Sequence, residues 1–183
     1  MSANRVRIVA GAYRSRVLRF PARPGLRPTP DRVRETLFNW LGQDLSGREC
    51  LDLFAGSGAL GFEAVSRGAS SVVMVESDRQ AFEALRQNAA ALGCQGSVEL
   101  VRADALEFMR DLARAFDIVF VDPPFASGLF GRLAVALPKL TRSGGLVYVE
   151  SGRGVELDGA AWHLQRQARA GHVTYQLFSH GHQ

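Results

Sequence analysis

Short apolar segments alternate with helical patterns through most of the chain from Glu49 onward. The predicted strands cover residues 50–54, 71–76, 98–102, 117–121 and 145–150, and the predicted helices cover residues 58–67, 78–92, 104–115 and 127–139. A strand such as Ile118-Val119-Phe120-Val121 is apolar on both faces, which is typical of a parallel sheet with helices on both sides. The sequence therefore predicts an α/β fold built on a doubly wound, mostly parallel sheet.

Two hairpins are predicted outside this alternation. Residues 5–9 and 13–20 alternate polar and apolar side chains on either side of Gly11-Ala12, which places Arg5 and Arg7 on one face and Ile8 on the other. Residues 162–179 contain two alternating runs separated by Ala170-Gly171. We expect the first hairpin to form an amino-terminal arm and the second to form an antiparallel edge of the sheet.

A proline-rich stretch, Pro21–Pro30, separates the arm from the remainder and predicts a linker or an ordered loop. Thr29-Pro30-Asp31 has the features of a helix start, and an apolar stripe at helical spacing follows it and ends near Gly42. We therefore divide the chain into residues 1–30, a basic hairpin arm with its linker, and residues 31–183, the main domain.

Positive charge is concentrated in the first quarter of the chain. Residues 1–48 contain ten arginines and three acidic residues, a balance of +7, whereas residues 49–183 carry −3. A basic arm on a mildly acidic body predicts a surface that binds a polyanion, although a solvated basic surface has the same composition.

The sequence predicts neither a membrane span nor an export signal. No apolar run approaches the ~20 residues of a transmembrane helix, and Met1–Arg5 lacks the apolar stretch of a secretory signal. Cys50 and Cys94 are expected to be reduced structural thiols, and no histidine pairs with either at metal-ligand spacing. We therefore expect a cytoplasmic, monomeric protein without a metal and without a membrane partner.

The segment Asp52–Gly61, DLFAGSGALG, follows the first strand of the sheet and opens a helix. Its glycines allow a tight turn and let a ligand approach bare backbone N–H groups at the positive end of a helix. The G-x-G-x-x-G spacing alone also occurs in enzymes that bind NAD or FAD. It therefore predicts a nucleotide-containing cofactor without deciding which one.

Two acidic residues stand at the ends of the next two strands. Glu76 comes twenty residues after Gly56, where a carboxylate accepts hydrogen bonds from both ribose hydroxyls of such a cofactor. Asp104, followed by Ala105, is a candidate to receive the adenine amino group, and its position before a helical run fits a helix N-cap nearly as well.

The fourth strand decides between the cofactors. It runs into Asp122-Pro123-Pro124-Phe125, which matches the [D/N/S]-P-P-[F/Y/W] signature of methyltransferases that modify planar amino groups. The Asp122 carboxylate and the Pro123 carbonyl are expected to accept the amino hydrogens, and Phe125 to stack on the base, a contact worth about 1–3 kcal/mol. A dehydrogenase has no need for this element, so the expected cofactor is S-adenosylmethionine.

These residues make up the predicted active site, in which the amino nitrogen attacks the sulfonium methyl group in line. The catalytic set is Asp122, Pro123, Pro124 and Phe125. The cofactor-binding set is Asp52, Phe54, Ala55, Gly56, Ser57, Gly58, Glu76, Ser77, Asp104 and Ala105.

With these motifs in place, nearly the whole chain resembles the bacterial small-subunit ribosomal RNA guanine-N2 methyltransferases of the RsmD type. The most specific segment is GLRPTPDRVRETLFNWL, residues 25–41, which generic methyltransferases lack. Residues 52–61, 119–125 and 148–151 agree as well, and residues 7–16 are similar to the opening R-I-x-x-G-x-x-[KR]-[GS]-[RK] of that family.

The resemblance implies a Rossmann-like class I methyltransferase fold, in which a seven-stranded, mostly parallel sheet has an antiparallel last strand. It also implies methylation of one guanine of 16S rRNA. We expect the substrate to be an assembled or assembling small ribosomal subunit with the base flipped out, because N2 is hard to reach in a paired stack. The candidate RNA-contacting residues are Arg5, Arg7, Arg14, Arg16, Arg27, Thr29, Arg32 and Arg34. The arginines near Asp31 and Glu35 could equally form ion pairs with these residues on the helix surface instead of contacting RNA.

Two other functions stay open at this point. The D-P-P-F motif does not distinguish adenine from guanine, so a DNA adenine-N6 methyltransferase would carry the same motif, although the chain has no room for a separate recognition domain. A non-catalytic RNA-binding assembly factor could keep the same fold and bind the cofactor without turnover, but the intact Asp122 and glycine loop argue against it.

Overall fold

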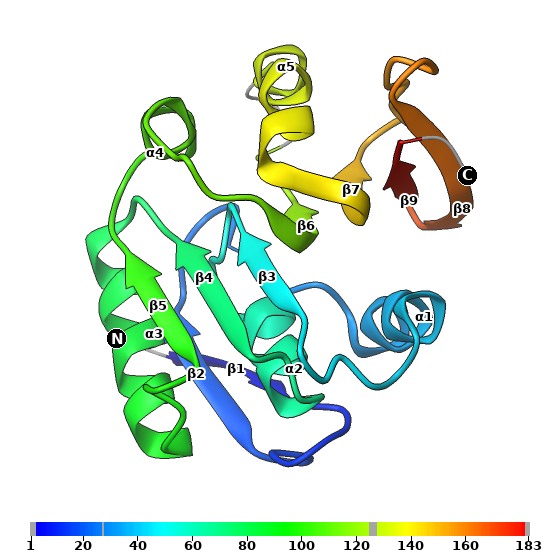
Figure 1. The fold of residues 1–183 in the computed structure, drawn as a ribbon. Helices are drawn as coiled ribbons and strands as arrows, with labels where there is room; N and C mark the ends of the chain where they lie inside the picture. Colours follow the sequence, from blue (N-terminus) through cyan, green and yellow to red (C-terminus); the bar gives the residue numbers. More distant parts are fainter. Residues whose placement is uncertain (1–2, 27, 125–127, 182–183) are drawn as a thin grey trace.

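The computed structural model describes residues 3–26, 28–124 and 128–181. Its centre is a seven-stranded sheet with the strand order β5-β4-β3-β6-β7-β9-β8 (Figure 1). The strands are β3 (Glu49–Asp52), β4 (Ser71–Val75), β5 (Val98–Val101), β6 (Phe116–Val121), β7 (Thr141–Ser151), β8 (Trp162–Ala170) and β9 (Val173–His180). The first five are mutually parallel, whereas β9 runs antiparallel to β7 and β8, so the expected seven-stranded sheet with an antiparallel edge hairpin is confirmed.

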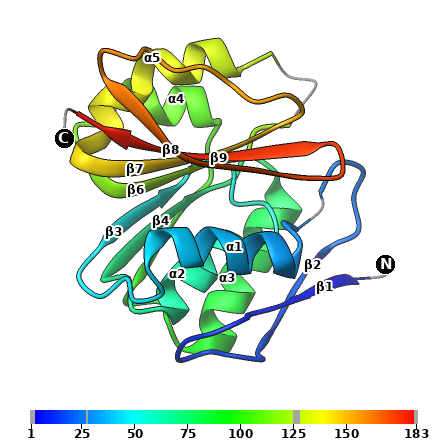
Figure 2. The same ribbon diagram turned by 90° about the vertical axis from the view of Figure 1, so that its right-hand side faces the viewer.

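Helices cover both faces of this sheet. They are α1 (Asp31–Leu41), α2 (Ala59–Ser66), α3 (Arg79–Leu92), α4 (Ala105–Arg110) and α5 (Phe130–Leu140). Figure 2 shows α4 and α5 on one side of the sheet and α1, α2 and α3 on the other. The side chains of β6 serve both layers, because Ile118 and Phe120 belong to the hydrophobic cluster of α1–α3 while Val119 and Val121 belong to that of α4 and α5. This two-sided burial explains why the strand sequence is continuously apolar.

Local sequence signals set the ends of α3. The Asp78 carboxylate accepts hydrogen bonds from the backbone N–H groups of Gln80 and Ala81 at the first turn, and Gly93 ends the helix in the left-handed conformation. The helix predicted over residues 104–115 is shorter in the structure and ends at Arg110. Tertiary contacts override helix propensity there, because Arg114 forms ion pairs with Glu49 and Glu99 and stacks on Phe116 at the start of β6.

The amino-terminal hairpin is confirmed. Strands β1 (Ala3–Arg7) and β2 (Val17–Pro21) pair antiparallel, with Val6 opposite Leu18. The connection is longer than the turn predicted at Gly11-Ala12, because residues 8–16 fold back against the end of α2. The N–H of Ala12 donates to the carbonyl of Ser66 at 2.7 Å. Gly11 is required at this contact, since it has φ +82° and a Cβ atom would lie 1.9 Å from that carbonyl oxygen.

The hairpin packs onto the body through apolar and charged contacts. Its inward-facing side chains, including Ile8 and Phe20, belong to the same hydrophobic cluster as those of α1 and α2. The carboxylate of Glu63, on α2, accepts hydrogen bonds from the N–H groups of Val9 and Ala10 at 2.8 and 3.0 Å. The arm is therefore held in a fixed position against α2.

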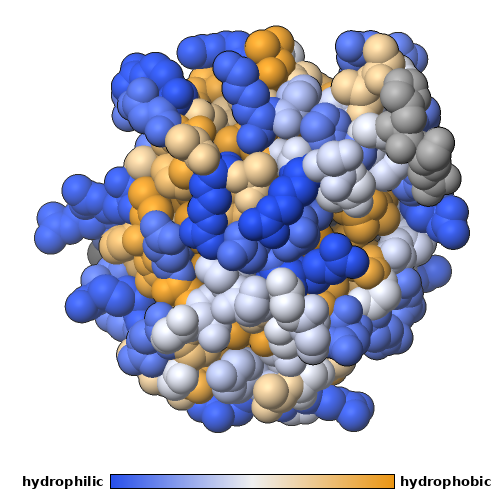
Figure 3. All heavy atoms as spheres, viewed as in Figure 1, coloured by the Kyte–Doolittle hydropathy of each residue, from blue (hydrophilic) through white to orange (hydrophobic). Residues whose placement is uncertain are grey.

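Apolar side chains reach the surface in patches that hydrophilic side chains interrupt on the face shown in Figure 3. Within the described residues, no helix has the length and apolar character needed to cross a membrane.

Candidate active site

The centre of the sheet is the point where the chain changes direction. After β3 the chain continues outward to β4 and β5, and it then returns to form β6 on the other side of β3 (Figure 1). Ligands of open α/β sheets bind in the crevice outside the carboxyl ends of the strands at such a switch point. Asp52 ends β3 at this place, Asp122 follows β6, and the glycine loop lies between β3 and α2.

Strand register brings three carboxyl groups to one face of the sheet. Asp52 is opposite Phe120 in the β3–β6 pair, and Asp122 comes two residues later on the same face. Val121 is opposite Val149 in the β6–β7 pair, so Asp122 and Glu150 are lateral neighbours. Parallel strands lie about 4.8 Å apart, which places these carboxyl groups close together on the side of the sheet that α1–α3 cover.

The shared burial of these groups disfavours their ionised forms. Desolvation raises the pKa of Asp52 to about 7, even though the N–H groups of Phe54 and Gly61 stabilise the charged form. Desolvation also raises the pKa of Asp122 well above its ordinary range, and the charges of Glu150 and Asp52 raise it further. Desolvation likewise raises the pKa of Glu150. In the described part of the chain, no group of three or more histidine, cysteine, aspartate or glutamate side chains is arranged to hold a metal ion.

The glycine loop is fixed against the neighbouring strand. The N–H of Ala55 donates to the carbonyl of Val75 at 2.9 Å, and the N–H of Gly56 donates to the carboxylate of Glu76 at 2.9 Å. Glu76 is partly buried, and desolvation raises its pKa. Gly58 is the N-cap residue of α2 and has φ +79°, and a Cβ atom there would lie 2.6 Å from the ring of Phe62. The loop thus depends on a glycine at this position.

Asp104 is a helix N-cap in the structure. Its Oδ1 atom accepts hydrogen bonds from the N–H groups of Leu106 and Glu107 at 2.8 and 3.2 Å. The side chain is exposed beyond the end of β5, with Ala105 buried beside it. The capping use is therefore confirmed, and contact with an adenine amino group stays a prediction.

The linker between the hairpin and α1 crosses the ends of three strands. Arg23 forms an ion pair with Asp78, which comes shortly after β4. The side chain of Leu26 lies against Gly56, where a Cβ atom would be 3.0 Å from Leu26 Cδ1. The hydroxyl of Thr29 donates to Oε1 of Glu150 at 2.8 Å. The linker thus contributes a wall to the switch-point crevice.

The candidate RNA-contacting residues fall into separate groups. The side chains of Arg5, Arg7, Arg14, Arg16 and Arg32 are exposed, and Arg16 also donates to the carbonyl of Ala91. Arg27 and the proposed stacking residue Phe125 lie outside the described residues.

The assignment of Arg34 to RNA contact is wrong. Its side chain is 0% exposed and donates to the carboxylate of Glu63 at 3.1 Å and to the carbonyls of Arg7 and Thr29. A buried arginine with this many acceptors joins α1 to α2 and to the arm. Thr29 is also buried, and its hydroxyl bonds to Glu150, so it belongs to the carboxylate site rather than to an exposed RNA-binding surface.

Glu150 and Tyr148 are site residues to which the sequence analysis assigned no role. Tyr148 is buried, and its hydroxyl donates to the same Oε1 atom of Glu150 at 2.9 Å. The signal was present in the sequence, because an acidic residue ends the apolar run 145–150 just as Asp122 follows the preceding strand. Recognising it would have required knowing that these two strands are neighbours.

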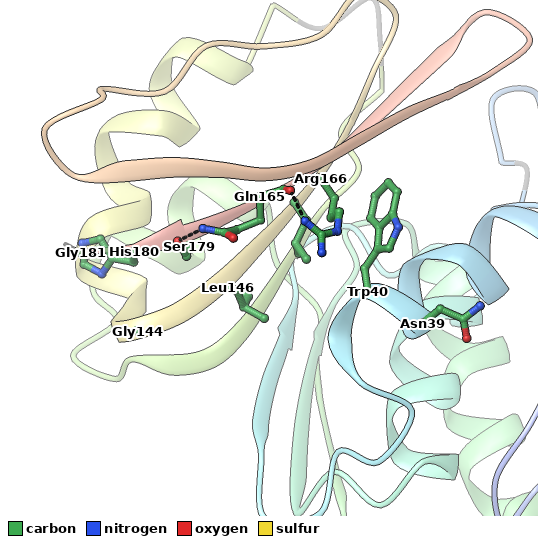
Figure 4. A pocket seen from close by; sticks show the side chains of 10 residues that line it. Asn39, Trp40, Gly144, Leu146, Gln165, Arg166, Ser179, His180 and Gly181 are labelled. Atoms are coloured by element: carbon green, nitrogen blue, oxygen red, sulfur yellow. Dashed lines mark hydrogen bonds between the residues drawn. The ribbon is translucent and has the colours of Figure 1, made fainter. Parts of the chain in front are cut away.

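A separate groove of about 370 Å³ lies at the opposite end of β7 (Figure 4). Trp40, at the end of α1, lies across it from Leu146 and Arg166, and Asn39 and further residues of β7, β8 and β9 complete the lining. None of the predicted catalytic or cofactor-binding residues lines this groove. The carboxylate site at the switch point therefore remains the candidate active site.

Comparisons with known proteins show the family of this chain. The family described as conserved hypothetical protein 95 matches residues 6–179. Ribosomal RNA small subunit methyltransferase D of Escherichia coli (strain K12) is 43% identical, with 96% of this chain and 90% of the relative covered. The protein of the same name from Haemophilus influenzae is 40% identical, with 94% and 93% covered. The solved structure of yhhF from Escherichia coli is 41% identical, covers 98% of this chain and 100% of its own, and superimposes with a TM-score of 0.87.

The sheet order, the glycine loop after β3 and the Asp-Pro-Pro element after β6 define a class I methyltransferase of the Rossmann-like kind. The family match and the two relatives cover nearly the whole chain. This protein belongs to the conserved hypothetical protein 95 family, the family of ribosomal RNA small subunit methyltransferase D.

Proposed function

We propose that this methyltransferase transfers a methyl group from S-adenosylmethionine to the exocyclic N2 atom of a guanine in 16S rRNA. The observation that carries the proposal is the position of Asp122 and Pro123, which stand at the carboxyl end of β6 beside the glycine loop of β3. The names of the similar proteins supply the class of RNA, and the exposed arginines of the arm supply a surface with the matching charge.

The residues around the switch point fit S-adenosylmethionine. The ribose hydroxyls and the amino group of this cofactor are hydrogen-bond donors, and Asp52 and Glu76 present acceptors at the ends of the adjacent strands β3 and β4. Gly56 and Gly58, both at positive φ, leave the backbone on either side of Ser57 without side chains. We assign the cofactor to this loop, with Glu76 at the ribose and Asp104 near the adenine.

The cofactor supplies an electrophilic methyl group on a sulfonium sulfur. Asp122 and the carbonyl of Pro123 orient the amino group of the base by accepting its two hydrogens, which directs the nitrogen lone pair at the methyl group. Pro123 is buried, so the position of its carbonyl is fixed by the packing around it. Alignment of this kind contributes roughly 7–11 kcal/mol in favourable cases. The surplus proton leaves the nitrogen during or after the transfer.

Selection of the target RNA rests on the arm and on α1. The exposed arginines 5, 7 and 14 lie on the hairpin, and Arg32 lies near the start of α1 beside the linker. Contacts of this kind position a polyanion without reading its sequence. We therefore expect the enzyme to prefer a small ribosomal subunit, which presents the base in a fixed shape, over naked 16S rRNA; equal rates on both would contradict this expectation.

The direct test is to incubate the purified protein with S-adenosylmethionine and small ribosomal subunits that lack the modification, and to identify methylated nucleosides by mass spectrometry. An Asp122→Ala sample runs alongside. N2-methylguanosine formed by the intact protein alone supports the reaction, the base and the residue together. Formation of N6-methyladenosine would instead identify the enzyme as an adenine-N6 methyltransferase. Cofactor binding without any methylation of subunits, naked RNA or DNA would favour a binding protein.

A further inference from the structure

Glu150 has a special place in the site because it combines proximity to Asp122 with a fixed orientation. It lies near the end of β7, one residue beyond the Val121–Val149 pair and therefore beside Asp122, which follows β6, and the residue is only 5% exposed. Two hydroxyl groups, Thr29 Oγ1 and Tyr148 OH, donate to its Oε1 atom at 2.8 and 2.9 Å. Both bonds use the same oxygen and hold the carboxyl group from one side.

In the ionised form of Glu150, the second carboxylate oxygen keeps its acceptor capacity. Among the described hydrogen bonds, none goes to Oε2 of Glu150. Each carboxylate oxygen has two lone pairs, so Oε2 is able to accept a hydrogen from a ligand. A ligand held at Asp122 would be next to this atom, because the two strands are lateral neighbours.

The edge of guanine that carries N2 presents a matching pair of donors. N1–H and the N2 amino group stand side by side on that edge, whereas in adenine N1 is an acceptor beside the N6 amino group. Asp122 and Pro123 alone accept an amino group from either base. A neighbouring carboxylate oxygen distinguishes the two bases. It accepts a hydrogen bond from N1–H of guanine, whereas it repels the lone pair on N1 of adenine, which weakens binding of that base.

We propose that Glu150 is the residue that selects guanine, by accepting the N1–H of the target base on Oε2 while Asp122 and Pro123 hold the N2 amino group. This proposal rests on the proposed function and adds the residue that determines its specificity. Thr29 and Tyr148 are positioning residues, which keep the second oxygen turned toward the base. The linker thereby contributes to base selection through Thr29.

The test compares guanine with 2-aminopurine at the target position. The wild-type enzyme first locates the modified guanine in small subunits by mass spectrometry. Reconstituted subunits then carry either guanine or 2-aminopurine at that position. 2-Aminopurine keeps the amino group that accepts the methyl but has a lone pair at N1, so the wild type should methylate it roughly 10- to 100-fold more slowly, the range for losing a hydrogen bond to a charged group. Equal wild-type rates on the two bases would overturn the proposal without any variant.

The second part of the test uses the variant Glu150→Gln. Glutamine keeps an oxygen for Thr29 and Tyr148 but presents an amide N–H in place of Oε2. This donor matches N1 of 2-aminopurine and opposes N1–H of guanine, so the ratio of the two rates should shift toward 2-aminopurine by 10-fold or more. An unchanged ratio would mean that Glu150 only supports the fold.

Tyr148→Phe is the matched control. It removes one donor to Oε1 and keeps the ring in the core, so both rates should fall together while their ratio stays near that of the wild type. A ratio that shifts as far as in Glu150→Gln would overturn the assignment to Oε2. If the wild type forms no N2-methylguanosine at all, the proposed function itself fails, which is a separate outcome from an unchanged ratio.

Discussion

Arg34 on α1 and Glu63 on α2 form an ion pair in which both side chains are fully buried, with 3.1 Å between Nη1 and Oε2. Arg67 donates to the other oxygen of Glu63 at 2.9 Å, and two N–H groups of the arm complete its hydrogen bonding. The carboxylate thus joins two helices and the hairpin behind the active site.

Removing the charge of Glu63 should destabilise the protein strongly. Glu63→Gln removes the counter-charge of the buried Arg67 and leaves Arg34 with the exposed Asp31 as its ion-pair partner, and breaking a buried pair in this way typically costs about 3–5 kcal/mol of the free energy of unfolding. Urea unfolding followed by tryptophan fluorescence measures it. The control is Glu83→Gln, which breaks an exposed ion pair with Arg86 on α3 and should leave the midpoint almost unchanged. Equal effects of the two variants would show that burial of the Glu63 network does not determine its contribution.

Cofactor binding should release a proton from Asp52. Desolvation raises its pKa to about 7, so the carboxyl group is mostly protonated at pH 6. The positive sulfonium of S-adenosylmethionine favours the ionised form and lowers this pKa, and binding at pH 6 should therefore release up to one proton. Titration calorimetry in two buffers with different ionisation enthalpies counts that proton. Asp52→Asn should bind without the release, and a wild type that also releases no proton would contradict the expectation.

The rate of methyl transfer should increase with pH. Burial and the neighbouring charges of Glu150 and Asp52 raise the pKa of Asp122 well above its ordinary value of 3.8, and Tyr148, the other titratable group facing Glu150, has its own pKa raised and stays protonated. The ionised carboxylate of Asp122 accepts amino hydrogens better than the acid, so single-turnover rates should rise through this pKa and then level off. Asp122→Asn should be slower and should lack the rise. The same profile in both proteins would assign the titration to another group.

Gly58 should tolerate no side chain. Gly58→Ala combines φ +79° with a Cβ atom 2.6 Å from the Phe62 ring and 2.7 Å from Leu85, so we expect a loss of about 2–4 kcal/mol in unfolding free energy together with loss of cofactor binding. Gly93→Ala is the matched comparison, because that glycine has φ +69° but nothing within 4 Å. It should cost about 1 kcal/mol and leave cofactor affinity intact. Unfolding curves and cofactor titrations of both variants decide the point.

Much of the architecture was predictable because the local pattern of apolar residues indicates which faces of a strand are buried. Runs that are apolar on both faces predicted the parallel strands, and the alternation of residues 162–179 predicted the edge hairpin. The glycine loop and the Asp122 element could be placed at strand ends from their sequence context. Their convergence required only the rule that carboxyl ends of parallel strands share one edge.

The remaining differences depend on partners distant in the sequence. Arg34 has the residue type of a surface position, and only the contact with Glu63, twenty-nine residues later, explains its burial. Helix α4 ends early because Arg114 engages Glu49 and Glu99. Glu150 gains its importance from lying beside Asp122 in a neighbouring strand. Periodicity alone contains no information on such contacts.

The path of the linker over three strand ends has a consequence for recombination between relatives. Arg23, Leu26 and Thr29 contact Asp78, Gly56 and Glu150, so this short segment is matched to residues at three strand ends of its own protein. A chimaera joined after Pro21 would exchange the hairpin and keep these three contacts. A chimaera joined after Pro30 would also take the linker of the other parent, so one side of the crevice would be lined by residues that are not matched to this active site. Exchanging the RNA-binding arm together with its linker would therefore also alter the active site.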